Sequence, residues 1–400
     1  MINLSPRDVR LLRLRAQRLQ PYAARTDLTD AVNSEIASST QNYQASRLAF
    51  RAHAAHDGLI DVVKSVVAVN AQSIPTMRLA LRARVSGLTV ADIDSALFDA
   101  RALVRGWLMR GTLHLAASDE YRWLVGVFGP AFLPGGAGRR AALGLDPDTL
   151  GVGLKHLHAI LDDHGALTRT QIVEELNTRG LALNRKSQTP IHLIRQAALA
   201  GLLCCGPDRD SEETFVLVDG WLAPQPSVPV ETPLAELARR YVAGYGPATL
   251  RDFVAWSGLR ASPSKVAWQS LIDAGQIIET RVGDLSLWVT PAALEDLSEP
   301  ALPAVSLLAA FDTLILGYAD RDLVVDPAHR AAVYHGGQTV PVVLVDGAAA
   351  GVWRSTTQFG RLDITVDMFH PVGSDITDLI GEQAGDIGRL LGRFAALEFV

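Results

Sequence analysis

The chain has 400 residues, of which 48% are hydrophobic and 20% charged, a composition that excludes a disordered or fibrous protein. Its length allows about two to four domains, each with a sizeable core. The net charge of −6 is unevenly distributed, because residues 1–200 carry 24 Lys+Arg against 17 Asp+Glu and residues 201–400 carry 13 against 26. This asymmetry is compatible with a first half that faces nucleic acid, and equally with two surfaces that are solvated differently.

The N-terminal 60 residues predict helices, with a polar surface segment at residues 35–44. The chain opens in a charged helical pattern that lacks the apolar core of a signal peptide. No apolar run approaches the roughly 18 to 20 residues that a membrane span needs. We therefore expect a cytoplasmic protein without a membrane partner.

Three later segments share one order of predicted elements, in which a threonine caps a helix and two strand-like runs flank a polar turn. The first segment has a predicted helix at residues 90–99, capped by Thr89, and strands at 103–108 and 112–116. The second has a helix capped by Thr168, a helix at 191–200 and strands at 202–205 and 215–218. The third has helices at 250–257, capped by Thr249, and at 263–274, and strands at 276–281 and 285–290. Helix, turn, helix and hairpin is the order of a winged helix, and three copies indicate tandem units.

Connectors and a change of pattern predict where these units end. Residues 135–138 predict a flexible loop, and residues 223–230, with three prolines, predict a linker. The only cysteines, Cys204 and Cys205, are neighbours in an apolar run, which predicts buried thiols without a disulfide.

Beyond about residue 300 the pattern changes to short strand-like runs, which predict a small barrel or curled sheet. The predicted strands are residues 306–309, 314–316, 339–345, 349–353 and 362–368, and a final helix is predicted at residues 376–397. The sequence thus predicts an α+β fold of tandem winged-helix units with a C-terminal β-barrel-like domain. The predicted domains are residues 1–134, 135–222, 223–298 and 299–400.

The segments 4–17, 107–115 and 311–321 resemble the AlkZ/YcaQ-like winged-helix DNA glycosylases, most specifically in the string Met-Arg-Gly-Thr-Leu-His-Leu at residues 109–115. The resemblance runs along nearly the whole chain except residues 20–56, which we interpret as an insertion that folding does not need. It implies tandem winged helices and a C-terminal β domain around a concave DNA channel. It also implies excision of bulky alkylated purines, including interstrand crosslinks.

The same resemblance implies which residues are catalytic. The family motif is Gln, an apolar residue, then Gln or Asp, and the matching residues here are Asn70, Ala71 and Gln72. Gln72 has the family side chain, whereas Asn70 is one methylene shorter. Residues two apart act together only on extended or loop backbone, and Pro75 disfavours helix immediately before it. Neither carboxamide titrates, so we expect them to stabilise charge on the sugar and to orient water.

Other polar residues are candidates for binding. Arg110 and His114 are expected either to contact DNA from a wing or to belong to a network that holds the fold. Arg139 and Arg140 are candidates for contact with DNA phosphate. The charged residues around Asp320 and Arg321 suggest an ionic network. No metal-binding spacing occurs, so we predict no metal and no cofactor.

Three functions remain open from the sequence. The first is a monofunctional DNA glycosylase that excises alkylated or crosslinked purines from duplex DNA, without a lyase step because the motif holds no lysine. The second is a catalytically silent DNA-binding or regulatory protein on the same scaffold, which the shorter Asn70 would fit. The third is a protein that sequesters a small molecule in the channel. We expect duplex DNA as the partner and a monomeric protein.

Overall fold

A computed structural model of the chain describes residues 2–19, 43–224, 232–295 and 303–400. The chain forms two compact units. Unit 1 combines Met1–Ala96 with Leu234–Val400, and unit 2 is Leu97–Pro233. These boundaries differ from the four consecutive segments expected from the sequence, because polar contacts between residues more than 200 positions apart join the two ends of the chain in unit 1.

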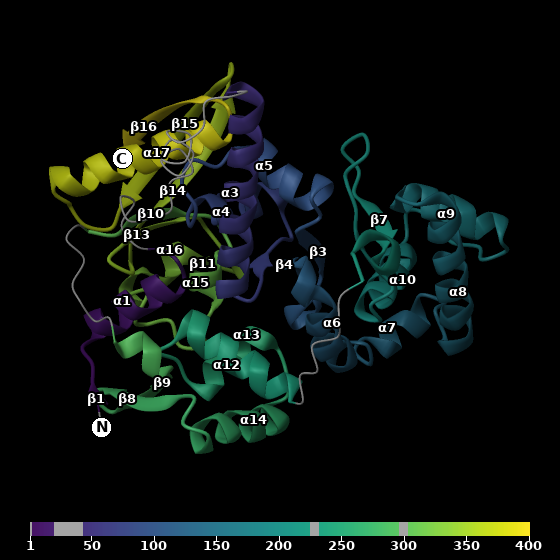
Figure 1. Ribbon diagram of the computed structural model, residues 1–400, viewed down its shortest axis with the longest axis horizontal. Helices are drawn as coiled ribbons and strands as arrows, with labels where there is room; N and C mark the ends of the chain where they lie inside the picture. The colour runs from purple at the N-terminus through teal and green to yellow at the C-terminus, as the bar shows by residue number, and fades with distance from the viewer. Residues whose placement is uncertain (1, 20–42, 225–231, 296–302) are drawn as a thin grey trace. The chain divides into compact units, whose positions relative to one another are not determined.

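Unit 1 contains helices from both ends of the chain and a five-stranded sheet (Figure 1). Its helices are α1 (Pro6–Ala16), α3 (Tyr43–Ser65), α4 (Ile74–Arg82), α5 (Val90–Asp94), α12 (Pro233–Tyr245), α13 (Leu250–Ser257), α14 (Ala261–Asp273), α15 (Thr313–Leu316), α16 (Arg330–Val333) and α17 (Ser374–Leu390). Its strands are β1 (Ile2–Asn3), β2 (Val69–Asn70), β8 (Ile278–Val282), β9 (Leu285–Val289), β10 (Val305–Leu308), β11 (Tyr334–His335), β12 (Gln338–Thr339), β13 (Val342–Val345), β14 (Ala348–Gln358), β15 (Arg361–Met368) and β16 (Phe394–Phe399).

Most of the expected insertion at residues 20–56 lies outside the described residues, including nearly all of the polar segment at 35–44. Helix α3 occupies the remainder of the insertion, from Tyr43 onward. Among the described helices, none combines the length and the apolar character needed to cross a membrane.

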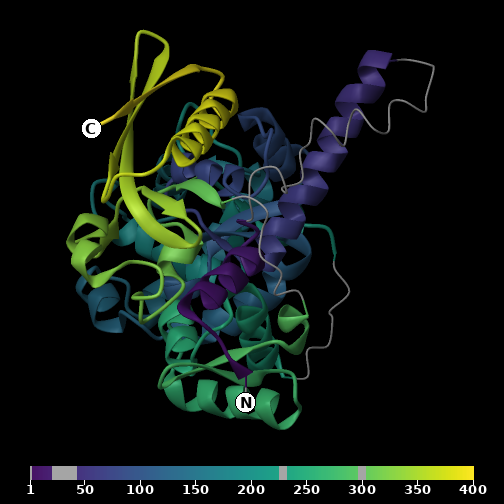
Figure 2. The same ribbon diagram turned by 90° about the vertical axis from the view of Figure 1, so that its left-hand side faces the viewer.

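The five-stranded sheet has the order β10-β13-β14-β15-β16, in which β15 and β16 run parallel and the other neighbours antiparallel. Helix α17 lies along this sheet (Figure 2) and buries Ile380, Ala384 and Ile387 against Trp353 and Ile364. Burial of such apolar side chains stabilises the layer by roughly 1.5–3 kcal/mol for each large residue.

Two predictions for this C-terminal region are wrong. Residues 314–316 form helix α15 rather than a strand, because the Asp312 carboxylate accepts a hydrogen bond from the Leu314 backbone N–H and caps a helical turn. The final helix ends at Leu390 rather than at residue 397. Gly392 has a φ of 62°, which ends the helix, and residues 394–399 pair with β15 as strand β16.

Unit 2 carries the elements of the second repeated segment together with the hairpin of the first. Its elements are β3 (Leu103–Trp107), β4 (Leu113–Ala117), α6 (Ser118–Phe132), α7 (Ala137–Ala142), α8 (Pro147–His164), β5 (Leu167–Thr168), α9 (Arg169–Thr178), α10 (Thr189–Leu199), β6 (Leu203–Cys205), β7 (Thr214–Leu217) and α11 (Val218–Trp221). The predicted loop at residues 135–138 is therefore partly helical, since α7 begins at Ala137. Most of the predicted linker at residues 223–230 lies outside the described residues.

The predicted order of helix, helix and hairpin is present in the second and third segments. In unit 2, β6 and β7 follow α9 and α10, and β5 joins them in the order β5-β7-β6. In unit 1, β8 and β9 follow α13 and α14. Each first helix begins with a reciprocal capping box, between Thr168 and Gln171 and between Thr249 and Asp252. Cys204 and Cys205 are free thiols buried in β6, as predicted.

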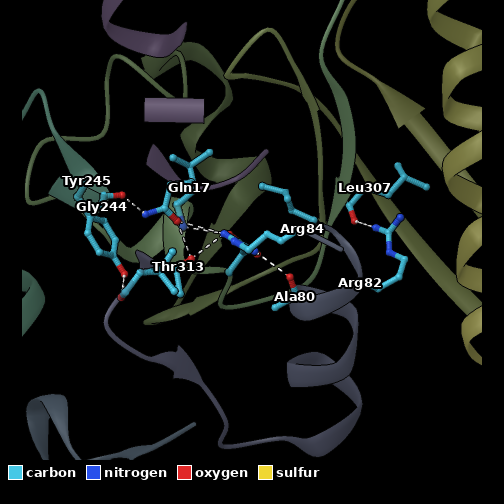
Figure 3. A network of polar contacts seen from close by, with 12 residues as sticks. Gln17, Ala80, Arg82, Arg84, Gly244, Tyr245, Leu307 and Thr313 are labelled. Atoms are coloured by element: carbon cyan, nitrogen blue, oxygen red, sulfur yellow. Dashed lines mark hydrogen bonds and ion pairs between the residues drawn. The ribbon is translucent and has the colours of Figure 1, made fainter. Parts of the chain in front are cut away.

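A buried polar network joins the chain ends within unit 1 (Figure 3). The Arg84 guanidinium donates to both carboxylate oxygens of Asp312 at 2.8 and 2.9 Å and to the Thr313 hydroxyl at 2.7 Å. Gln17 accepts from Arg84 at 3.1 Å and donates to the Gly244 carbonyl at 2.5 Å. Arg84 is 2% exposed, so the ion pair is shielded from solvent.

We predict that Arg84→Met lowers the free energy of unfolding of unit 1 by about 3–5 kcal/mol, because the substitution leaves the buried Asp312 carboxylate without its cation. Thermal unfolding followed by circular dichroism measures the effect. Arg354→Met is the matched control, since Arg354 is exposed and a surface change should stay within about 0.5 kcal/mol. Equal melting temperatures for the two variants would show that the ion pair contributes nothing.

Candidate active site

The predicted catalytic residues lie in unit 1, where Asn70 is the last residue of β2 and Gln72 lies in the short connection from β2 to α4. Asn70 is 7% exposed, and its Oδ1 accepts a hydrogen bond from the Gln72 backbone N–H at 3.4 Å. The Asn70 Nδ2 is buried and has no hydrogen-bond partner among the described residues. Gln72, in contrast, is exposed. The shorter carboxamide is therefore tied to the connection itself, while the longer one is available to a ligand.

The backbone around these residues is not helical, as the sequence predicted. Helix α3 ends at Ser65, and Val67 then adopts a φ of 67°. A β-branched residue with a positive φ lies in the left-handed region and is strained. Such strain persists only where the surrounding structure fixes the backbone. Helix α4 starts after Ser73, whose hydroxyl accepts from the Thr76 N–H. Asn70 and Gln72 thus lie between a strained turn and a capped helix.

Contacts from α12 fix the chain just before the connection. The Tyr245 hydroxyl donates to the Val66 carbonyl at 3.0 Å (Figure 3). Gly244 lies against the Ser65 backbone so closely that a Cβ at residue 244 would overlap the Ser65 carbonyl oxygen. Burial raises the pKa of Tyr245 to about 12, so its hydroxyl keeps its proton and remains a donor near neutral pH.

Contacts with the C-terminal region fix the chain just after the connection. Arg82, at the end of α4, donates to the Leu307 carbonyl at 2.7 Å and to Gln383 at 2.8 Å. Arg84 follows with the pair to Asp312, and Gln17 links Arg84 to Gly244. Both flanks of the connection are therefore held by buried polar contacts, which preorganise the position of the Gln72 backbone.

The other predicted residues belong to unit 2, where Arg110 lies in the turn between β3 and β4. Its φ of 54° is in the left-handed region, which is uncommon for a residue with a side chain. Gly111 has a φ of 64°, and a Cβ there would overlap the Arg195 guanidinium. The Arg195 Nε donates to the Gly111 carbonyl at 3.3 Å. The positive φ favours glycine at this position, and a Cβ would have to displace the end of the Arg195 side chain.

His114 lies inside unit 2 and is 2% exposed. Its Nδ1 is 2.9 Å from the Thr112 carbonyl oxygen, so this nitrogen carries the hydrogen and donates it. Burial, reinforced by the positive charge of Arg110, holds the pKa of His114 at about 3. His114 is therefore neutral at physiological pH, and it stabilises the turn that carries Arg110.

Arg139 and Arg140 lie on α7 beside the basic side chains of α10. Arg139 is exposed and donates to Gln188 at 2.8 Å. Arg140 is 8% exposed and donates to the Gly135 carbonyl. Burial and the charges of Arg195, Arg139 and Arg140 lower the pKa of His192. Four basic groups, Arg139, Arg140, His192 and Arg195, therefore gather at the start of α10.

Sequence patterns did not predict a role for His192, for Arg195 or for the residues that hold the connection. His192 and Arg195 are three apart on the predicted second helix, so their shared face was available as a signal. Gln17, Arg84 and Tyr245 gave no signal, because their partners lie 67 to 296 positions away along the chain. The structure brings Asn70 and Gln72 together on unit 1 and the four basic groups together on unit 2.

The chain is similar to known proteins in sequence and in fold. The model of the family described as AlkZ-like DNA glycosylases matches residues 63–397. The interstrand DNA cross-link repair glycosylase of Streptomyces sahachiroi is 29% identical over 273 residues, which is 64% of this chain and 71% of that protein. The solved structure of Streptomyces sahachiroi DNA glycosylase AlkZ has a similar fold, with a TM-score of 0.74 at 23% identity and 100% coverage of both chains.

We predict that His114 makes stability depend on pH between about 3 and 6.5. Its folded pKa of about 3 lies below the usual 6.5, so the unfolded chain binds a proton first and stability falls as the pH drops through 6.5. The loss reaches about 2 kcal/mol at pH 5. Melting temperatures of wild type and His114→Gln at pH 7.5 and pH 5 test this. The variant should lose less stability than wild type, and equal losses would contradict a buried neutral histidine.

Proposed function

The chain belongs to the AlkZ-like DNA glycosylase family, and we propose that its substrate is duplex DNA carrying an alkylated purine, including purines crosslinked between strands. The relative from Streptomyces sahachiroi, named as an interstrand cross-link repair glycosylase, supports this substrate class. The observation that carries the proposal is the exposed Gln72 carboxamide on a connection that is fixed at both flanks. Family membership favours this function over a silent DNA-binding protein and over a sequestering protein.

The reaction is hydrolysis of the bond between the base nitrogen and the sugar carbon C1′. An N7-alkylated purine is cationic, so the bonding electron pair leaves with the base and neutralises it. Positive charge then develops on the deoxyribose ring. The Gln72 carbonyl dipole stabilises this charge and orients a water molecule, whose oxygen bonds to C1′ while its proton passes to solvent.

The residues of the motif explain why this weak catalysis suffices only for an activated base. Neither Asn70 nor Gln72 can exchange a proton near neutral pH, so neither acts as a general base. The activated leaving group supplies the driving force instead. The motif also contains no lysine for a Schiff base, which makes the proposed enzyme monofunctional.

Asn70 acts on the connection rather than on the base in this proposal. Its Oδ1 accepts from the Gln72 backbone N–H, and its side chain is buried. We therefore assign Gln72 to direct stabilisation of the sugar and Asn70 mainly to the position of Gln72.

We further propose that the repeated segments are winged-helix units. The order α8, β5, α9, α10, β6 and β7 supports this for unit 2, with β5 paired to β7. In unit 1, α12, α13, α14, β8 and β9 follow the same order, and Ala248 forms a bridge to Trp288 where unit 2 has β5. The second helix of such a unit commonly enters a DNA groove, and the wing contacts the backbone.

The basic groups of unit 2 are the proposed DNA interface. Arg139, Arg140, His192 and Arg195 surround the start of α10, and the lowered pKa of His192 reflects its burial together with their combined positive charge. Phosphate would offset this repulsion. Arg110 is proposed as a further contact from the turn after β3, with the buried His114 supporting it. A cytoplasmic location and a monomeric state remain predictions.

We predict that Gln72→Ala reduces excision about 100- to 1000-fold, which is the loss expected when one aligned dipole leaves a preorganised site. Asn70→Ala should cost less, because Asn70 is buried and acts through the backbone of Gln72. Asn70→Gln should keep activity equal or higher if the connection accepts the longer side chain. The measurement is single-turnover release of N7-methylguanine from duplex DNA.

Gln269→Ala is the matched control for these variants, because Gln269 is an exposed glutamine on α14. This variant should excise at the wild-type rate. A larger loss for Asn70→Ala than for Gln72→Ala would reverse the assignment of roles. Release by Asn70→Gln but not by wild type would make the natural chain a DNA-binding relative without chemistry.

We predict that Arg139→Ala weakens binding of unmodified duplex DNA and lowers the slope of log affinity against log salt by about one. Arg139 is suited to this test because it is exposed, whereas Arg140 is bound to Gly135 and its loss would disturb α7. Arg185→Ala is the matched control, since Arg185 is exposed but paired with Glu174. Fluorescence anisotropy at several salt concentrations gives both quantities. Wild-type affinity and slope in Arg139→Ala would remove this residue from the interface.

A further inference from the structure

A second concentration of arginines lies on unit 1, around a hollow of about 580 Å³. Its lining includes Arg251, Arg321 and Arg330 together with Asp320 and Tyr334. Residues 201–400 carry only 13 Lys+Arg against 26 Asp+Glu. Three arginines at one hollow are therefore unexpected from the acidic composition of this half. Asp320 and Arg321 lie in a charge cluster that the sequence pattern predicts to be an ionic network, and neither residue has a role in the proposed function.

Asp252 brings the two sides of the hollow together. This residue is 3% exposed, and its Oδ2 completes the capping box with Thr249. Its Oδ1 accepts from the backbone N–H groups of Ala319 at 2.9 Å and Asp320 at 3.3 Å. The segment after Tyr318 is thereby fixed against the first turn of α13. Arg251 and Arg321, which directly adjoin these bonded residues, line the same hollow as a result.

The arginines differ in how they are held. Arg330 forms an ion pair with Asp322. The Arg321 guanidinium lies 4.4 Å from the centre of the Tyr334 ring, and its Nε donates to the Tyr318 carbonyl at 3.3 Å. Stacking on a ring fixes the guanidinium plane and leaves its other N–H groups for a ligand. Arg251 is exposed on α13.

The lining of the hollow carries more positive than negative charge, with three guanidiniums and one carboxylate, that of Asp320. Of the carboxylates nearby, Asp322 pairs with Arg330, and both oxygens of the buried Asp252 accept hydrogen bonds. Within the described part of the chain, neither Arg251 nor Arg321 forms an ion pair with a carboxylate. Two guanidiniums are thus available for one anion, and their planar donors match the oxygens of a phosphate.

We propose that this hollow, formed by Arg251, Arg321 and Arg330, binds a phosphodiester group of the DNA backbone. The assignment rests on the proposed function, since duplex DNA is the phosphate polymer on which a DNA glycosylase acts. It gives unit 1, which carries Asn70 and Gln72, a DNA contact of its own in addition to the basic groups of unit 2. Such a contact fixes position on the duplex without reading its sequence.

The test is the affinity of the full-length chain for an unmodified duplex of about 20 base pairs, measured by fluorescence anisotropy from about 50 to 200 mM KCl. Arg251→Gln and Arg321→Gln should each weaken binding roughly 3- to 10-fold and lower the salt slope by about one. Arg251→Lys should retain most of the slope, because the charge remains. Arg393→Gln, an exposed arginine beyond α17, is the control and should bind like wild type. Unchanged melting temperatures show that the variants fold.

Wild-type affinity and slope in both Arg251→Gln and Arg321→Gln would overturn the proposal. A second measurement, the melting temperature with inorganic phosphate, distinguishes DNA phosphate from a small anion. Inorganic phosphate could raise the melting temperature of wild type but not of Arg251→Gln, while the two proteins bind DNA with equal affinity. The site would then bind a free anion, and the DNA assignment would be wrong. If Arg139→Ala weakens DNA binding and the variants of the hollow do not, the DNA contact of unit 1 fails while the proposed function stands. Failure of wild type to bind DNA would contradict the proposed function itself.

Discussion

The buried ion pair between Arg84 and Asp312 is the interaction on which unit 1 depends. Its partners are 228 positions apart, and the Arg84 guanidinium also bonds to Gln17 and Thr313. An ion pair without solvent tolerates little displacement, because either charge alone would be costly to bury. The pair therefore fixes the end of α4 relative to the C-terminal region, and Gln17 extends the same constraint to α12 through Gly244.

This constraint has a direct meaning for the proposed chemistry. A carboxamide stabilises a developing charge only if its dipole is already aligned, since reorientation during the reaction would consume the benefit. The strained Val67, the hydroxyl of Tyr245 and the capped start of α4 all limit the backbone on either side of Gln72. The flanks are thus held by several contacts, while the Gln72 side chain, the proposed contact with the sugar, is exposed.

Basic side chains cluster in both structural units, although the first half of the sequence is basic and the second half is acidic. In unit 2, basic groups gather at the start of α10, and the buried neutral His114 supports the turn of Arg110 without adding charge. In unit 1, an acidic C-terminal half nevertheless collects three arginines at one hollow. The net charge of a stretch of sequence therefore does not predict where basic side chains cluster on the folded protein. Tertiary contacts decide which charged residues lie together.

Local patterns in the sequence were sufficient to specify the elements of the repeated segments. Threonine caps, helical spacing and hairpin turns act within a few residues, so helices at residues 169–178 and 250–257 and the hairpins after them were predictable. The family resemblance, together with the same local patterns, singled out Asn70 and Gln72. Local patterns predicted a strand at α15 and a helix at β16, and both predictions were wrong. The Asp312 cap stabilises a helical turn at α15, and pairing with β15 makes β16 a strand.

The burial of Asn70, the exposure of Gln72 and the bonds that hold their backbone were beyond any local pattern. Gln17, Arg84 and Tyr245 take part in those bonds, and their partners are separated from them by 67 to 296 positions. Such contacts exist only once the two ends of the chain have folded together, because sequence spacing carries no information about which distant polar groups will meet. The candidate residues, and the prediction that Gln72 contributes more to catalysis than the shorter Asn70, were therefore available from the sequence. The burial of Asn70 and the contacts that hold the flanking backbone came only from the folded protein.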